Sequence, residues 1–169
     1  VTKSARQSGV YPYYGASGVV DYVSDYLLDD TVLLVSEDGA NLKSRVTPIA
    51  FTASGKIWVN NHAHILKFTD SDLHKNVEVY LNYIDLTEYI TGQAQPKLNQ
   101  INLNSINIPF PPKNIQQKIV SEIEALEKQQ KNILDRISKH KDSINLSLQG
   151  LLNNAKETIR LKLRLEKEF

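Results

Sequence analysis

The sequence predicts an α+β protein, with a small twisted-sheet domain that contains one helix and a long C-terminal coiled-coil helix after it. All six prolines and six of the seven glycines lie at or before residue 112. Short runs of β-branched and aromatic residues alternate with turn residues in that part. Beyond it, apolar residues recur at heptad spacing, and only Gly150 interrupts. We therefore expect a domain over residues 1–112 and a helical region over residues 113–169.

Four short segments of the first part predict strands, namely residues 18–23, 31–35, 56–59 and 63–68. Each is rich in β-branched or aromatic residues and is bounded by Gly, Asp or Ser. We expect one twisted sheet from them, mostly antiparallel or mixed.

One amphipathic helix is predicted after these strands. Its apolar positions follow helical spacing: Leu73, Val77, Tyr80, Leu81 and Ile84. Asp70 and Ser71 precede them as candidate N-caps, and Gly92 marks the latest point at which the helix can end.

The helical region carries a heptad seam with steps of four and three residues. Its members are Ile119, Ile123, Leu126, Gln130, Ile133, Ile137, His140 and Ile144. A continuous helix of this region would be about 85 Å long, far longer than a small domain. We therefore expect the seam to pair with another helix, from this chain, from a second copy or from a longer parent protein. Gln130 and His140 are polar seam positions of the kind that fix register.

Composition excludes several classes of protein. The chain has no cysteine, so disulfides, thiolate zinc sites and cysteine nucleophiles are ruled out. No apolar run is long enough for a membrane helix, which favours a soluble protein of the reducing cytosol. The chain begins at Val1, which suggests a processed or excised piece.

The net charge of +1 combines an acidic first part, with eight Lys and Arg against eleven Asp and Glu, and a basic second part, with twelve against eight.

Motifs of common enzymes are absent from the sequence. There is no GxGxxG, no P-loop and no GxSxG elbow, and a methyltransferase would need a cofactor domain that this length does not supply. His62 and His64 would face one side of a strand, but two ligands without a third do not make a metal site. A metal-dependent enzyme that uses this pair stays open as an alternative, and we assign no cofactor, metal or catalytic residue.

Polar and aromatic side chains are crowded at the turns, in residues 11–18, 38–45, 52–56, 60–62 and 92–99. Amides, hydroxyls, Lys and Arg are the groups that read base edges and bind phosphates. Loops that only need to be hydrated use the same residue types, so composition alone leaves DNA reading as one interpretation among others.

These segments, taken in order, resemble a target-recognition domain and the conserved helix of a type I restriction-modification DNA specificity subunit. The resemblance covers nearly the whole chain. It rests on GVYPYYGASG, LLVSEDGA, ASGKIWVNNHAH and GQAQPKL, and most of all on IPFPP before QQKIV. These segments correspond to residues 9–18, 33–40, 53–64, 92–98 and 108–120.

The resemblance implies a non-catalytic role in a prokaryotic cytoplasm. A full specificity subunit has two such domains, each reading half of a split DNA target, and two long helices that pair as a spacer and dock methyltransferase subunits. This chain has one of each, so we expect either a C-terminal fragment or a half-subunit that forms a homodimer. A homodimer would recognise a symmetric, interrupted sequence.

The expected partners are double-stranded DNA, the methyltransferase subunit and, through it, the restriction subunit. Methyltransferase docking is expected around residues 109–120. Recognition loops vary within the family, so DNA contacts are chosen from residue chemistry: Tyr13, Tyr14, Lys43, Arg45, Ser54, Lys56, Asn61, His62, Gln95 and Lys97.

The sequence leaves parallel and antiparallel pairing of the seam open. A coiled-coil adaptor that binds protein and not DNA is the alternative function, favoured by the acidic first part.

Overall fold

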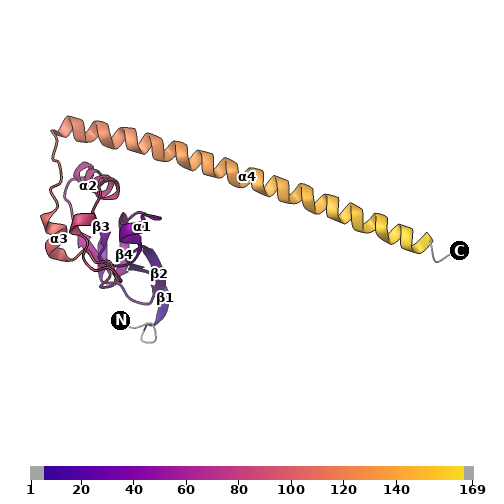
Figure 1. Ribbon diagram of the computed structural model, residues 1–169, viewed down its shortest axis with the longest axis horizontal. Coiled ribbons are helices and arrows are strands. Elements are labelled where there is room, and N and C mark those ends of the chain that lie inside the picture. Colours follow the sequence, from indigo (N-terminus) through magenta and orange to yellow (C-terminus); the bar gives the residue numbers. More distant parts are fainter. Residues whose placement is uncertain (1–5, 166–169) are drawn as a thin grey trace. The chain divides into compact units, whose positions relative to one another are not determined.

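The computed structural model of the chain describes residues 6–165, with side chains up to residue 156 (Figure 1). It divides into two compact units, Val1–Val120 and Ser121–Phe169. The first unit is an α+β domain built on a five-stranded mixed sheet, and the second is helical. The predicted fold class is confirmed.

The sheet has the strand order β2-β1-β4-β3-β5. The strands are β1 (Ser8–Gly15), β2 (Gly18–Val23), β3 (Leu28–Ser36), β4 (Ala50–Val59) and β5 (Ala63–Leu66). Neighbouring strands are antiparallel except β1 and β4, which run parallel with Tyr13 opposite Trp58.

Two hydrophobic clusters cover the two faces of β3. Leu33 and Val35 join a cluster that includes Leu81 of the helix α2 (Ser71–Tyr83), whereas Val32 and Leu34 join a cluster formed by strand residues. Because both faces of this strand are covered, its apolar residues run consecutively instead of alternating with polar ones. This explains why residues 31–35 were recognisable as a strand.

The predicted amphipathic helix is α2 (Ser71–Tyr83). The carboxylate of Asp70 accepts hydrogen bonds from the backbone N–H groups of Asp72 and Leu73, at 2.8 and 3.0 Å, and so caps the helix. Near its other end, Asn82 accepts from the N–H groups of Ile49 and Ala50 and ties the helix to the start of β4.

Four elements of the first unit were not predicted, among them the strand β1 and the helix α3. The strand β1 contains Pro12 and ends at Gly15, and these residues made its aromatic segment look like a loop. The helix α3 (Gln100–Ser105) is short, and Asn99 caps it through the N–H of Asn102 at 2.9 Å. The first unit also contains α1 (Asn41–Ser44) and the 3-10 turn η2 (Thr87–Tyr89).

The long helix α4 (Lys113–Leu165) has 53 residues, a length of about 80 Å. Its first turns belong to the first unit, where Gln116 and Val120 are buried. The predicted boundary after residue 112 is therefore the start of the helix, while the compact unit continues to Val120. Within the described residues, no helix is long and apolar enough to span a membrane.

Candidate nucleic-acid interface

Four loops of the first unit are joined to one another by hydrogen bonds, and we call them together the loop surface. They are residues 15–18, 37–45, 60–62 and 91–98. The hydroxyl of Ser36, just before the second loop, donates to the carbonyl of Ala16 in the first. The N–H of Glu37 donates to the carbonyl of His62 at 2.9 Å, which links the second and third loops.

The fourth loop is attached to the second by further backbone bonds. The N–H of Leu98 donates to the carbonyl of Glu37 at 2.7 Å, and the N–H of Gly39 donates to the carbonyl of Pro96 at 3.0 Å. Lys97 and Thr91 pair within the loop itself. The loops are therefore positioned by the backbone, which leaves their exposed side chains available for a ligand.

Five of the predicted DNA contacts lie on the loop surface with exposed side chains: Lys43, Asn61, His62, Gln95 and Lys97. They come from three different loops, and folding brings them onto one structure. The Nζ of Lys43 lies 3.4 Å from the carbonyl oxygen of Gly92, a neutral group, so its charge is not offset by that contact. These amide, imidazole and ammonium groups are suited to base edges and phosphates.

Acidic residues on the loop surface were missed by the sequence analysis. The Nζ of Lys97 lies 3.0 Å from a carboxylate oxygen of Glu37, and this hydrogen bond raises the pKa of Lys97. The Nδ1 of His62 lies 2.7 Å from Oδ2 of Asp38. Glu37 and Asp38 therefore offset part of the positive charge while they hold two candidate contact residues in place. The signal available in the sequence was their position directly after a predicted strand.

The histidine pair does not converge on one point. His62 lies in a turn and pairs with Asp38, whereas Nε2 of His64, on β5, lies 2.7 Å from the carbonyl oxygen of Leu98. Among the described residues, no group of three or more His, Asp or Glu side chains is arranged to hold a metal ion.

Arg45 has a structural role, and its assignment as a DNA contact stays a prediction. It ends α1 with a φ of 51°, and its guanidinium donates to the carbonyl oxygens of Leu42, Leu81 and Ile84, each at 3.1 Å. Burial lowers the pKa of Arg45, while the charge of Asp85 opposes that shift. The donors of Arg45 are thus directed at the protein's own backbone.

Tyr13 is buried, with only 1% of it exposed, so base reading by its ring is not supported, while a positioning role stays a prediction. Its ring stacks beside Trp58 with centroids 6.3 Å apart, and the guanidinium of Arg6 lies 4.2 Å above it. Tyr14 is half-buried and stacks on Phe51. Successive side chains of β1 point to opposite faces of the sheet, and each of these two rings meets an aromatic partner on its own face.

Ser54 and Lys56 are exposed but lie away from the four loops in the chain, beside Gly55 on β4. The hydroxyl of Thr31 donates to that of Ser54 at 3.0 Å, and the ammonium of Lys56 lies 4.9 Å from the centre of the Tyr26 ring. The partners of both side chains thus lie outside the loop surface, and their role in DNA binding stays a prediction.

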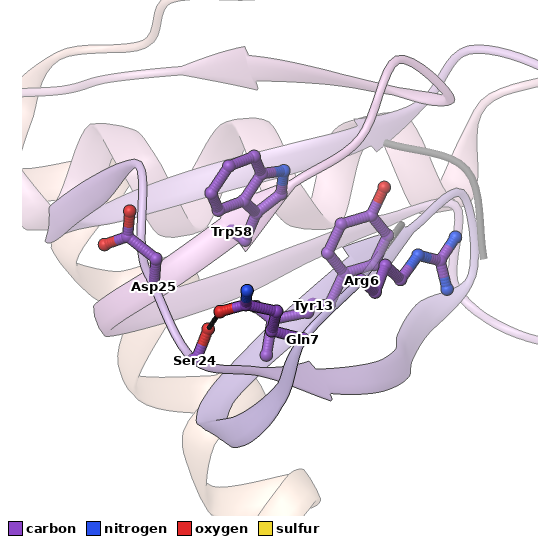
Figure 2. Close-up of a pocket in the computed structure, with 7 residues that line it drawn as sticks. Arg6, Gln7, Tyr13, Ser24, Asp25 and Trp58 are labelled. Atoms are coloured by element: carbon purple, nitrogen blue, oxygen red, sulfur yellow. Dashed lines mark hydrogen bonds between the residues drawn. The ribbon is translucent and has the colours of Figure 1, made fainter. Parts of the chain in front are cut away.

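A cavity of about 190 Å³ lies between β1, β2 and β4 (Figure 2). Its lining residues are Arg6, Gln7, Tyr13, Val23, Ser24, Asp25 and Trp58. Arg6 pairs with Asp21 at 3.0 Å, and its buried Nε has no hydrogen-bond partner. No pattern in the sequence indicates this cavity, because its walls come from segments far apart in the chain.

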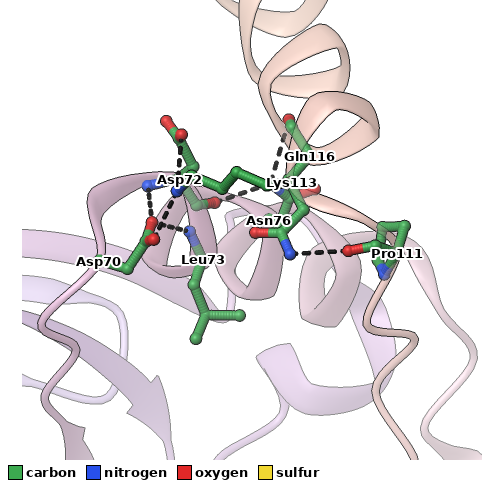
Figure 3. Close-up of polar contacts among 7 residues, drawn as sticks. All are labelled: Asp70, Asp72, Leu73, Asn76, Pro111, Lys113 and Gln116. Atoms are coloured by element: carbon green, nitrogen blue, oxygen red, sulfur yellow. Dashed lines mark hydrogen bonds and ion pairs between the residues drawn. The ribbon is translucent and has the colours of Figure 1, made fainter.

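The start of α4 is fastened to α2 by polar contacts (Figure 3). Lys113 pairs with Asp70 and, at 2.9 Å, with Asp72. Asn76 donates to the carbonyl of Gln116 at 3.3 Å, and the side-chain amide of Gln116 donates to the carbonyl of Pro111 at 2.8 Å. We call this the helix junction. Its α4 side lies within residues 109–120, where methyltransferase docking is expected.

The predicted seam lies on α4, and most of its apolar side chains are exposed: Leu126 by 63%, Ile133 by 54%, Ile137 by 45% and Ile144 by 59%. Ile119 and Ile123 are half-buried, and Gln130 and His140 are exposed. An exposed apolar stripe of this length marks an interaction surface.

Residues 1–153 match the family model of the type I restriction modification DNA specificity domain. The chain belongs to this family. A Haemophilus influenzae protein whose assigned name is that of a type I restriction enzyme specificity subunit is 35% identical over 127 residues, which are 75% of this chain and 32% of that protein. The specificity-domain family thus accounts for the domain and for most of α4.

A solved structure supports the same fold. The S subunit of the type I restriction-modification system of M. genitalium aligns with a TM-score of 0.57 at 13% identity, over 78% of this chain and 36% of that one. This specificity-domain chain therefore spans about a third of the length of both relatives.

Proposed function

We propose that this chain is the sequence-reading module of a restriction-modification complex, and that it reads one half of a split DNA target through the loop surface. Membership in the specificity-domain family is the observation that carries the proposal. The loop surface supports it, because exposed Lys43, Asn61 and Gln95 from separate loops are held on one backbone framework. The alternative of a protein-binding adaptor without a DNA role has no support among the relatives.

In this proposal the chain supplies specificity and performs no catalysis. Methyl transfer belongs to a methyltransferase subunit that docks at the helix junction, and a restriction subunit joins through that enzyme. The junction offers a suitable surface, because Phe110 is 72% exposed beside Leu73, Pro111 and Pro112, which line a shallow cavity with it. The complex would act on DNA in a prokaryotic cytoplasm.

Pairing of α4 with the helix of a second copy is the third part of the proposal. Such a dimer would carry two identical reading domains and would select a symmetric, interrupted target. The exposed stripe of α4 supports this, since it has the spacing of a coiled coil.

The test is to express the full chain with its methyltransferase subunit in cells and to map methylated sites by sequencing. We expect methylation at one interrupted, symmetric sequence, lost when the chain is omitted. The variant Gln95→Ala should change or weaken methylation at specific bases, while Lys67→Ala, an exposed lysine outside the loop surface, should not. Methylation that is identical without the chain would refute the proposal.

Docking has a separate test. The variant Phe110→Ser should reduce co-purification of the methyltransferase subunit at least tenfold. The control is Ile101→Ser, which changes an apolar residue on α3 that is 80% exposed. Equal co-purification of both variants and the unmodified chain would remove the junction from the docking surface.

A further inference from the structure

A buried nitrogen beside the cavity between β1, β2 and β4 has no hydrogen-bond partner. It is Nε of Arg6, and no other buried side-chain nitrogen or oxygen of residues 6–156 lacks one. Another nitrogen of the same guanidinium pairs with Asp21 at 3.0 Å, and the group lies 4.2 Å from the centre of the Tyr13 ring, so Arg6 is held in place. An unpaired buried donor costs free energy. A ligand that brings an acceptor into the cavity would remove this cost.

A carboxylate lies at the opposite end of the cavity. In Figure 2, Asp25 and Arg6 lie on either side of Trp58, and all three line the cavity. The Oδ1 of Asp25 accepts a hydrogen bond from the N–H of Tyr26 at 2.8 Å, which leaves Oδ2 for a ligand, and the side chain is exposed. The cavity therefore offers an acceptor at one end and a donor at the other.

The space between these two groups suits a flat ring. The cavity has a volume of about 190 Å³, somewhat more than the roughly 150 Å³ of an apolar cavity that holds benzene, so it has room for one ring system. The half-buried indole of Trp58 forms one wall. Aromatic side chains of this kind bind nucleobases by stacking. The amide of Gln7 and the hydroxyl of Ser24 add further polar groups to the lining.

We propose that this cavity binds one unpaired guanine base, carried by a free nucleoside or nucleotide or by a nucleic-acid strand. Guanine has two adjacent N–H donors on one edge, N1 and N2, and these bind the carboxylate of Asp25. On the opposite side of the ring system N7 is an acceptor for Arg6, while the ring stacks on Trp58. Adenine has an acceptor at N1, which the carboxylate repels. None of the lining side chains belongs to the loop surface, so the site is additional to the proposed target reading.

The single tryptophan of the chain makes this proposal measurable, because Trp58 lines the cavity. Guanosine is titrated into the full chain, and Trp58 fluorescence and calorimetry are the two readouts. We expect saturable quenching and an affinity at least about tenfold higher than for adenosine, since adenosine leaves the carboxylate without its two donors. Quenching and affinity that are the same for both nucleosides would overturn the proposal.

The source of the base is decided by a second pair of ligands. One is a DNA duplex with a single bulged guanine, and the other is the same duplex fully paired. Quenching by guanosine indicates a free nucleoside or nucleotide, and quenching by the bulged duplex beyond that of the paired one indicates a strand. If neither is seen, the cavity binds no guanine and the proposal is wrong. The nucleoside titration contains no DNA, so its outcome is independent of target reading.

The variant Asp25→Asn tests the carboxylate. A side-chain amide both accepts and donates, so it no longer matches the two guanine donors but does match xanthine, which has an oxygen in place of the N2 amino group. We expect the affinity for guanosine to fall about tenfold and the affinity for xanthosine to rise, a gain that a misfolded chain cannot show. Asp29→Asn, at an exposed position of β3 outside the cavity, is the control. Equal affinity of both variants for guanosine would refute the proposal.

Discussion

The guanidinium of Arg45 donates a 3.1 Å hydrogen bond to the backbone carbonyl of Leu81, near the C-terminal end of α2. Two further bonds reach the carbonyls of Leu42 and Ile84. One side chain thus attaches the loop that carries Lys43 to the helix that covers the sheet. Lys43 is only two residues away and exposed, so the two cations have different surroundings despite their proximity in sequence.

Replacement of Arg45 by alanine should destabilise the first unit. Carbonyls of Leu81 and Ile84 would lose a charged donor in a partly buried place, so we expect the free energy of unfolding to fall by at least about 1.5 kcal/mol. Urea denaturation followed by tryptophan fluorescence measures this, since Trp58 lies in the first unit. A variant as stable as the unmodified chain would contradict the structural role of Arg45.

Lys43→Ala should act on DNA binding and leave stability within about 0.5 kcal/mol, as is usual for an exposed surface residue. Loss of one phosphate contact should make the slope of log affinity against log salt shallower by about 0.9. Fluorescence anisotropy with a labelled duplex at several salt concentrations measures the slope. Lys67→Ala is the matched control, and an equal change in both variants would mean that Lys43 has no specific place at the interface.

Most of the fold was predictable because its signals are local. The continuous apolar run of β3 reflects two covered faces, and Asp70 identified the start of α2 through its capping chemistry. The strand β1 was not predictable, since Pro12 and Gly15 are turn residues in most contexts and only its pairing with β2 and with the distant β4 makes it a strand. Pairing between distant segments leaves no periodic trace in the sequence.

The candidate site was predictable to a lesser extent. Residue chemistry selected Lys43, Asn61 and Gln95, which lie exposed on the loop surface, but it also selected Tyr13 and Arg45, whose side chains are used within the protein. Aromatic and guanidinium groups serve the interior and DNA equally well. Only the fold determines which groups already have partners.

The helix junction should be sensitive to pH at both extremes. The hydrogen bond from Lys113 lowers the pKa of Asp70, and the bonds to Asp70 and Asp72 raise the pKa of Lys113. A carboxyl group whose pKa is lowered in the folded chain contributes stability at pH values above its pKa in the unfolded chain. This contribution is lost as the pH falls through the pKa of the folded chain. A lysine whose pKa is raised in the folded chain contributes stability at pH values below its pKa in the unfolded chain. This contribution is lost as the pH rises through the pKa of the folded chain. The pairing should therefore be intact through the neutral range.

Carboxyl-carbon NMR shifts of Asp70 across an acid titration check this behaviour. We expect a midpoint below that of an ordinary aspartate, moving back toward the ordinary value in Lys113→Gln. A matched control is Lys118→Gln, which removes a lysine of α4 that is not among the groups that shift Asp70. An ordinary midpoint in the unmodified chain would contradict the junction contacts.

Two glycines should respond in opposite ways to replacement by alanine. Gly92 has a φ of +79°, and a Cβ there would lie 2.3 Å from the carbonyl oxygen of Gln95, so Gly92→Ala should distort the fourth loop and weaken DNA binding. Gly150 lies within α4 with open space around it, and Gly150→Ala should favour the helix by about 1 kcal/mol. Circular dichroism during heating and DNA anisotropy measure both effects. Unchanged binding by Gly92→Ala would show that the conformation of the fourth loop does not matter for target reading.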